Sequence, residues 1–190
     1  MSLKTQERRK YEKCWNHDAY RNMAPGEVLV QDVLSNINKS EKIIDFGTGT
    51  GRGAKIIHDN GNPVVMIDLA DNCLDPEVKK ALDPNFRFLE ECLWDELHVE
   101  GDYAYCTDVL EHIPPEKVDD VLKNIVKACP KGYLNISTIQ DHFGTVLGEA
   151  LHLTVEPWDW WAHKVQEFAT VEKLRINPTS VSIWFNKKED

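Results

Sequence analysis

A glycine-rich turn constrains the fold of this chain more than any other sequence feature. It follows the apolar run 43–46 and contains four glycines in seven residues, Gly47, Gly49, Gly51 and Gly53. Glycine allows sharp turns and close approach of the main chain to a ligand, and the helix-like segment that follows offers free N–H groups and a positive dipole end. A turn between a strand and a helix lies at the carboxyl edge of a parallel sheet, where ligands bind. The segment therefore predicts a ligand-binding loop in an α/β fold.

Strand-like and helix-like segments alternate through the first 140 residues, which is typical of a parallel sheet with helices on both faces. The apolar periodicity predicts helices at 4–20, up to about 37, and at 54–60, 77–82, 115–129 and 157–168. It predicts strands at 42–46, 63–68, 85–89, 102–106, 133–139, 169–176 and 180–186. The last two strands are joined by a connection too short for a parallel crossover, so we expect them to pair antiparallel.

Length and charge narrow the class of protein. The 190 residues fit one domain, with residues 1–39 as N-terminal helices and 40–190 as the core. The net charge of −10 disfavours general binding to a phosphate backbone. We see neither a long apolar run that would span a membrane nor an apolar signal core at the N-terminus, and the five scattered cysteines are typical of reduced thiols. We therefore expect a cytoplasmic protein without a membrane partner.

Two ligand patterns overlap in the glycine turn. Gly49-x-Gly51-x-x-Ala54 fits the dinucleotide form GxGxxG/A. Asp45-x-Gly47-x-Gly49-x-Gly51 fits a different form, an acid followed by three alternate glycines, and it resembles the nucleotide loop of class I S-adenosylmethionine (SAM)-dependent methyltransferases. The second form also accounts for the acid at the end of the strand. A dehydrogenase would need a second lobe for its substrate, and too few residues remain to build one.

The resemblance extends over residues 40–186. Residues 102–114, which end in Leu-Glu-His-Ile-Pro, strongly resemble the fourth strand of small-molecule-type members of this family and the loop after it. Residues 130–133 resemble the turn before the fifth strand, with Tyr133 in place of its second glycine. The resemblance implies a Rossmann-like, doubly wound, mostly parallel seven-stranded sheet with an antiparallel C-terminal strand pair, and N-terminal helices that form a lid.

The resemblance also implies which residues contact SAM. The loop residues would hold the methionine end, Asp68 would accept hydrogen bonds from both ribose hydroxyls, and Leu69 would lie against the adenine. Glu91 would accept from the adenine amino group and Cys92 would supply a backbone N–H, while Arg21 would meet the carboxylate of SAM. The full predicted set is Asp45, Gly47, Thr48, Gly49, Gly51, Asp68, Leu69, Glu91, Cys92, Cys106, Thr107 and Arg21.

The predicted activity is methyl transfer from SAM to a small-molecule acceptor by in-line displacement. His142 and then His152 are the candidate bases, because an unperturbed imidazole titrates near neutral pH. The spacing of His142, His152 and His163 does not match a zinc signature, so we expect no catalytic metal. The tryptophans at 158, 160 and 161 either pack a helix on the sheet or line the acceptor pocket.

Three alternatives stay open at this point. The motif typical of enzymes that methylate DNA amino groups is absent, but a protein or tRNA acceptor remains. The overlapping GxGxxA pattern allows an NAD(P)-dependent oxidoreductase. A SAM-binding module without catalysis would have the same loop and no acceptor turnover.

Overall fold

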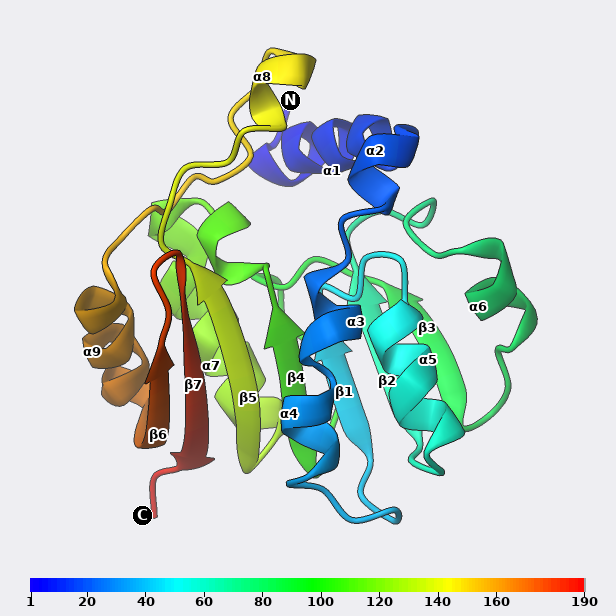
Figure 1. The fold of residues 1–190 in the computed structure, drawn as a ribbon, viewed down its shortest axis with the longest axis vertical. Coiled ribbons are helices and arrows are strands. Elements are labelled where there is room, and N and C mark those ends of the chain that lie inside the picture. The colour runs from blue at the N-terminus through cyan, green and yellow to red at the C-terminus, as the bar shows by residue number, and fades with distance from the viewer. Residues whose placement is uncertain (190) are drawn as a thin grey trace.

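A seven-stranded sheet organises the molecule (Figure 1). The structure, a computed structural model, describes residues 1–189. The strand order is β3-β2-β1-β4-β5-β7-β6. The strands are β1 (Ile43–Phe46), β2 (Val64–Asp68), β3 (Phe86–Glu90), β4 (Tyr103–Thr107), β5 (Lys131–Ser137), β6 (Ala169–Ile176) and β7 (Ser180–Lys187).

Strand direction follows the sequence prediction. β1 to β5 pair in parallel, and β7 pairs antiparallel with both β5 and β6. Every residue of β1, β2 and β4 is buried, as expected for strands that are covered on both faces. The predicted Rossmann-like, mostly parallel sheet with an antiparallel C-terminal pair is confirmed.

Helices cover the two faces of the sheet and build two apolar clusters. One cluster joins the sheet to the helices that supply Val121, Ile125 and Trp161, and the other joins it to the helices that supply Val33 and Ile57. The first face is covered by α7 (Val118–Ala128) and α9 (Trp158–Phe168), and the second by α3 (Pro25–Leu29), α4 (Gln31–Leu34), α5 (Arg52–Asp59) and α6 (Pro76–Lys80). All five cysteines are buried free thiols.

The helices above the carboxyl edge of the sheet are shorter than predicted. The expected helix 4–20 is divided into α1 (Leu3–Cys14) and α2 (Asp18–Arg21), and the helix expected up to residue 37 is divided into α3 and α4. The start of the predicted helix 115–129 is the 3₁₀ turn η2 (Pro115–Lys117), which precedes α7. A further 3₁₀ turn, η1 (Leu110–His112), and the short helix α8 (Gly144–Leu147) were not predicted. In Figure 1, α1, α2 and α8 lie across the top of the sheet.

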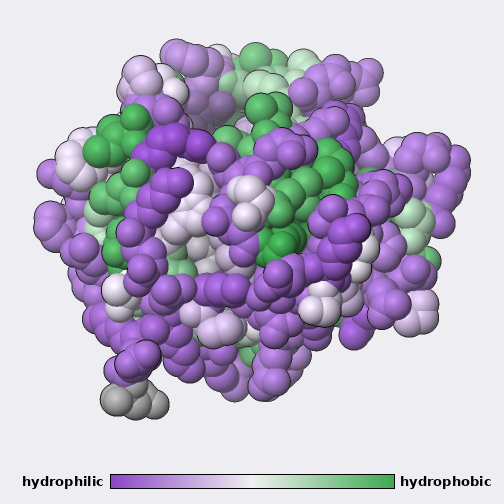
Figure 2. Space-filling model, turned by 60° about the horizontal axis from the view of Figure 1, so that its bottom comes forward, coloured by the Kyte–Doolittle hydropathy of each residue, from purple (hydrophilic) through white to green (hydrophobic). Residues whose placement is uncertain are grey.

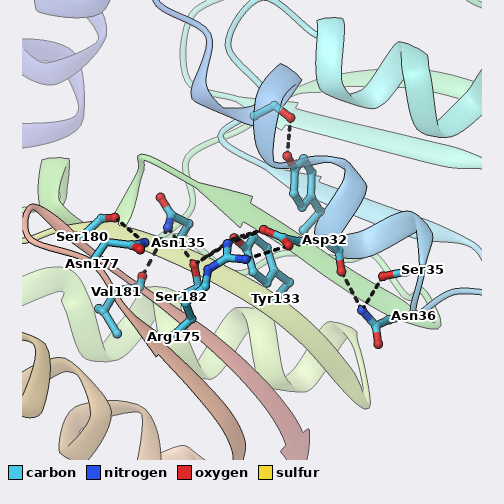
Figure 3. Close-up of polar contacts among 12 residues, drawn as sticks. Asp32, Ser35, Asn36, Tyr133, Asn135, Arg175, Asn177, Ser180, Val181 and Ser182 are labelled. Atoms are coloured by element: carbon cyan, nitrogen blue, oxygen red, sulfur yellow. Dashed lines mark hydrogen bonds and ion pairs between the residues drawn. The ribbon is translucent and has the colours of Figure 1, made fainter.

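A polar cluster fastens the N-terminal segment to the C-terminal strands (Figure 3). Arg175 of β6 makes a two-pronged ion pair with Asp32 of α4, with one N···O distance of 2.8 Å. The Tyr133 hydroxyl lies 3.2 Å from the same carboxylate and 3.0 Å from the hydroxyl of Ser182. Residues more than a hundred positions apart in the chain are thereby held side by side.

The surface shown in Figure 2 is mostly hydrophilic, and its hydrophobic side chains form separate patches. Within residues 1–189, no helix combines the length and the apolar character needed to cross a membrane.

Candidate active site

The glycine turn adopts a conformation that depends on glycine. Gly47, Gly49 and Gly51 have φ angles of 72°, 54° and 74°. A Cβ atom on Gly47 would lie 2.4 Å from Cγ2 of Val109, so a side chain does not fit there. A Cβ atom on Gly49 would lie 3.0 Å from the ring of Trp15, which covers the turn from the end of α1. The turn therefore presents its main chain to the space under α1.

Two buried carboxylates hold this turn. The Thr48 hydroxyl donates to Asp45 Oδ2 over 2.6 Å, and the Gly49 N–H donates to Asp68 Oδ2 over 2.9 Å. Burial raises the pKa of Asp45 to about 7, against the opposing effect of the Thr48 hydrogen bond. Burial likewise raises the pKa of Asp68 to about 6, against its backbone N–H donors. A carboxylate has about four acceptor positions, so Asp68 can still accept from a ligand.

A cavity of about 520 Å³ opens from this turn along the carboxyl edge of the sheet. Six aromatic side chains line it, together with the acids and imidazoles described below. They are Tyr11, Trp15, Tyr20, Trp94, Tyr105 and Phe143. The Nε1 atom of Trp15 is buried and has no hydrogen-bond partner among residues 1–189. The cavity thus has flat apolar walls, and the Trp15 N–H is enclosed by protein atoms.

Most of the predicted site residues line this cavity. They are Asp45, Gly47, Thr48, Gly49, Asp68, Leu69, Cys92, Thr107, His142 and His152. His142 is exposed, and His152 is partly buried. The turn, the ends of β2 and β4, and the segment after β5 therefore meet at one place, although they are far apart in the sequence.

Four predicted contacts lie outside the lining of the cavity. Gly51 packs against the apolar side chains of Leu74 and Val78. Glu91 is half-buried and does not reach the cavity, whereas its neighbour Cys92 does. Cys106 points into the apolar core because alternate residues of a strand face opposite sides of the sheet.

Arg21 is the fourth, and other groups occupy its guanidinium. It donates to the carbonyl oxygens of Trp15, Asn72 and Cys73 and forms an ion pair of 2.6 Å with Asp75. These contacts fix the connection between α1 and α2, and they position Trp15 above the glycine turn. The sequence predicted that Arg21 lies near the site, but it did not predict which groups its guanidinium contacts.

The tryptophans near α9 have a packing role. Trp161 is fully buried in the core, Trp160 packs against the same cluster, and Trp158 is 41% exposed. None of the three lines the cavity.

The sequence reasoning did not bring together a second group of polar residues in the cavity wall. The Tyr11 hydroxyl lies 2.8 Å from Nδ1 of His112, and the ring centroids of His112 and His152 are 4.6 Å apart. Burial lowers the pKa of His112 to about 4, so its ring is neutral at neutral pH. Asp108 also lines this wall and has a φ of 59°. The segment Leu-Glu-His-Ile-Pro indicated this part of the site, but it did not indicate that His152 contacts it from another loop.

Comparison with known proteins agrees with this geometry. A family model described as a methyltransferase domain matches residues 15–175. A ubiquinone biosynthesis O-methyltransferase of Idiomarina loihiensis is 30% identical over 96 residues, which are 48% of this chain and 37% of that protein. The match thus spans little more than a third of the length of that relative.

Two solved structures share the fold. The magnesium protoporphyrin IX methyltransferase of Synechocystis PCC 6803 with bound S-adenosylhomocysteine (SAH) has a TM-score of 0.72 at 16% identity, covering 97% of this chain and 99% of that one. A 1,6-didemethyltoxoflavin-N1-methyltransferase of Burkholderia thailandensis has a TM-score of 0.65 at 17% identity, covering 97% and 85%. The family resemblance predicted from the sequence is confirmed, and the chain belongs to the methyltransferase domain family.

Proposed function

We propose that this protein transfers a methyl group from SAM to a small-molecule acceptor. The observation that carries the proposal is the cavity that connects the glycine turn and Asp68 with the aromatic walls. The family assignment supports methyl transfer over hydride transfer. The relatives whose names specify small acceptors support an acceptor of that size.

The residues present fit SAM. We assign the ribose hydroxyls to the acceptor positions that remain on Asp68, and the adenine to the wall formed by Leu69 and Cys92. The glycine turn faces the methionine end, where a side chain on Gly47 would collide with Val109.

Methyl transfer from SAM requires mainly that the protein positions the acceptor. When SAM is bound, it supplies an electrophilic methyl group on a positively charged sulfur. Tyr11, Tyr20 and Phe143 exclude water and hold the acceptor in line with that methyl group. If the acceptor carries a proton that must leave early, exposed His142 at the cavity is our candidate to receive it.

Ligand-dependent thermal unfolding tests the cofactor. At a thousand times its dissociation constant, SAH adds about 4 kcal/mol to the free energy of unfolding, which raises the midpoint by roughly 8–16 °C in a domain of this size. Asp68→Asn should weaken SAH binding by about 10–100-fold, because charge-assisted hydrogen bonds to the ribose are lost. Asp71→Asn, at an exposed neighbouring position, is the matched control and should bind like the parent protein.

Other outcomes separate the alternatives. A shift with NAD(P) and none with SAH would overturn the proposal. A shift with SAH but no methyl transfer to any of a panel of small aromatic and quinone-like acceptors would favour a SAM-binding module without catalysis. Turnover of a protein or tRNA acceptor instead would correct the acceptor class.

A further inference from the structure

Three side chains with metal-binding donors meet at one wall of the cavity. Asp108, His112 and His152 each bring one ligating atom to within 4.8 Å of the other two. Asp108 follows β4, His112 ends η1, and His152 lies on the segment after α8. All three residues line the cavity. The expectation of no metal rested on the spacing of His142, His152 and His163, and the cluster uses a different pair of histidines.

The hydrogen bonds of both histidines leave the same nitrogen free. Nδ1 of His112 lies 3.1 Å from the carbonyl oxygen of Leu151, and Nδ1 of His152 lies 2.6 Å from the carbonyl oxygen of Ile139. A carbonyl oxygen only accepts, so Nδ1 carries a hydrogen in each ring, the Tyr11 oxygen is a second acceptor for that of His112, and Nε2 is the nitrogen left for a metal. Metal-bound histidines typically donate their other N–H to a main-chain carbonyl or a carboxylate in this way. The two rings stand nearly perpendicular, at 89°.

Next to these donors lies a buried carboxylate atom with nothing to bind. Glu111 is fully buried, and its Oε1 accepts from the Ser137 N–H over 2.5 Å. Its Oε2 has no hydrogen-bond partner in the described part of the chain, and its carboxyl group lies beside Asp108. One oxygen donor and two nitrogen donors thus lie together in the cavity wall, with a buried carboxyl group behind them.

The geometry points to a divalent transition-metal site, and we propose that Asp108, His112 and His152 bind this cation at the wall of the cavity. Two imidazole nitrogens and one carboxylate oxygen suit Zn²⁺ and its neighbours better than Mg²⁺ or Ca²⁺, which prefer oxygen ligands. Three protein ligands would leave at least one coordination position open for a group in the cavity that all three residues line.

The open coordination position of the metal would also select the class of methyl acceptor. This inference about the acceptor rests on the proposed function. An acceptor hydroxyl bound there would lose its proton to solvent at neutral pH, because a metal ion lowers the pKa of a bound oxygen. The oxygen would then form a bond to the methyl carbon while the carbon–sulfur bond breaks and its electron pair stays on sulfur as SAH forms. We therefore infer an acceptor that the metal can deprotonate, a hydroxyl or by the same chemistry a thiol, rather than a carbon acceptor.

Metal binding is tested on the whole protein without any cofactor. The chain is stripped with a chelator, desalted and titrated with ZnCl₂ in a calorimeter, with MgCl₂ in a parallel titration. We expect one Zn²⁺ per chain and a much weaker response to Mg²⁺. Co²⁺ in place of Zn²⁺ should show visible d–d bands without the near-ultraviolet absorption of a thiolate ligand, because the three proposed ligands include no cysteine.

Variants assign the site to these residues. His152→Ala and Asp108→Asn should each weaken Zn²⁺ binding by about 100-fold or more, since loss of an outer partner alone costs 10–100-fold. His142→Ala, which changes a histidine of the same cavity outside the cluster, and His163→Ala on α9 are the matched controls and should bind Zn²⁺ like the parent. The SAH-dependent thermal shift of each variant verifies that it is folded.

Each result has one meaning. No Zn²⁺ binding by a protein that SAH still stabilises would overturn the metal site and leave the proposed function intact. Equal Zn²⁺ binding by His152→Ala and the parent would also overturn it. Zn²⁺ binding without any SAH response would retain the site and overturn the methyl-transfer proposal.

Discussion

The hydroxyl of Tyr11 lies 2.8 Å from Nδ1 of His112, so the first helix is hydrogen-bonded directly to the wall of the cavity. The two rings meet edge to face with centroids 5.8 Å apart. α1 is therefore part of the candidate site and not only a cover for it.

Tyr11→Phe tests this connection. Removing one buried hydrogen bond should lower the free energy of unfolding by about 1 kcal/mol, because the His112 N–H keeps its carbonyl partner. Tyr20→Phe is the control, since the Tyr20 hydroxyl has no hydrogen bond within residues 1–189, and it should change stability by less than about 0.5 kcal/mol. Urea denaturation measures both, and equal effects of the two variants would contradict a specific link through Tyr11.

Gly47→Ala should be far more damaging than Gly148→Ala. Both glycines have φ near 70°, so each alanine carries a similar backbone cost of about 1 kcal/mol. Only at Gly47 would the new Cβ also collide with a neighbour, Val109, whereas nothing lies within 4 Å at Gly148. We expect Gly47→Ala to cost roughly 2–4 kcal/mol and to abolish SAH binding. Similar losses in the two variants would show that the contact with Val109 relaxes easily.

Asp45 should make stability depend on pH. Its pKa rises from an ordinary value near 3.8 to about 7 on folding, because burial disfavours the charge. The free energy of unfolding that it contributes is fully present below about pH 4 and falls as the pH rises to about 7. Asp45→Asn, which keeps an acceptor for Thr48, should therefore be more stable than the parent by roughly 2–4 kcal/mol at pH 8.

The same comparison at about pH 4.5 supplies the control. There the advantage of Asp45→Asn should shrink to about 1 kcal/mol or less, because the parent carboxyl is then neutral in the folded state and only partly ionised in the unfolded state. Urea denaturation at the two pH values gives the difference between the variants, in which the effects of acids that do not interact with Asp45 cancel, and Asp68 is the acid that does interact. A variant that is less stable than the parent at both values would show that the carboxylate has an unaccounted partner.

Asp32→Asn should weaken the fold without weakening the site. The Asp32–Arg175 pair is partly exposed and joins α4 to β6 away from the cavity, so its loss should cost about 1 kcal/mol or less. The exposed pair Lys80–Glu77 is the matched control, and Lys80→Ala should fall within about 0.5 kcal/mol of the parent. Calorimetric titration with SAH should give the same affinity in all three proteins. A lower affinity for Asp32→Asn would mean that the contact between α4 and β6 is coupled to the cavity.

The sheet could be predicted because its signal is local. The runs around Ile44 and Ile67 are apolar over consecutive residues, and the stripe from Val118 to Val126 repeats at helical spacing, so each segment shows its state by itself. The glycine turn and Asp68 were predicted for the same reason, since their chemistry is confined to a few neighbouring residues.

The long-range contacts could not be predicted in this way. The contact between Arg21 and Asp75 spans 54 positions, and the contact of His112 with the main chain at Leu151 spans 39. Such contacts depend on how separate loops fold over the edge of the sheet, which no periodicity indicates. The interruption of the predicted helix 4–20 has the same origin, because the carbonyl of Trp15 receives the Arg21 guanidinium at the break.

The position of α1 has a consequence for the order in which the molecule is made. Lys4 pairs with Asp95, Tyr11 contacts His112, and Lys10 donates to the carbonyl of Ala150. During synthesis α1 therefore leaves the ribosome well before any of its partners exist. Its buried face, with Glu7, Lys10 and Cys14, is covered only after residue 150 has been added, and the cavity is completed only with His152. A chain stalled before that point holds the glycine turn but no closed pocket.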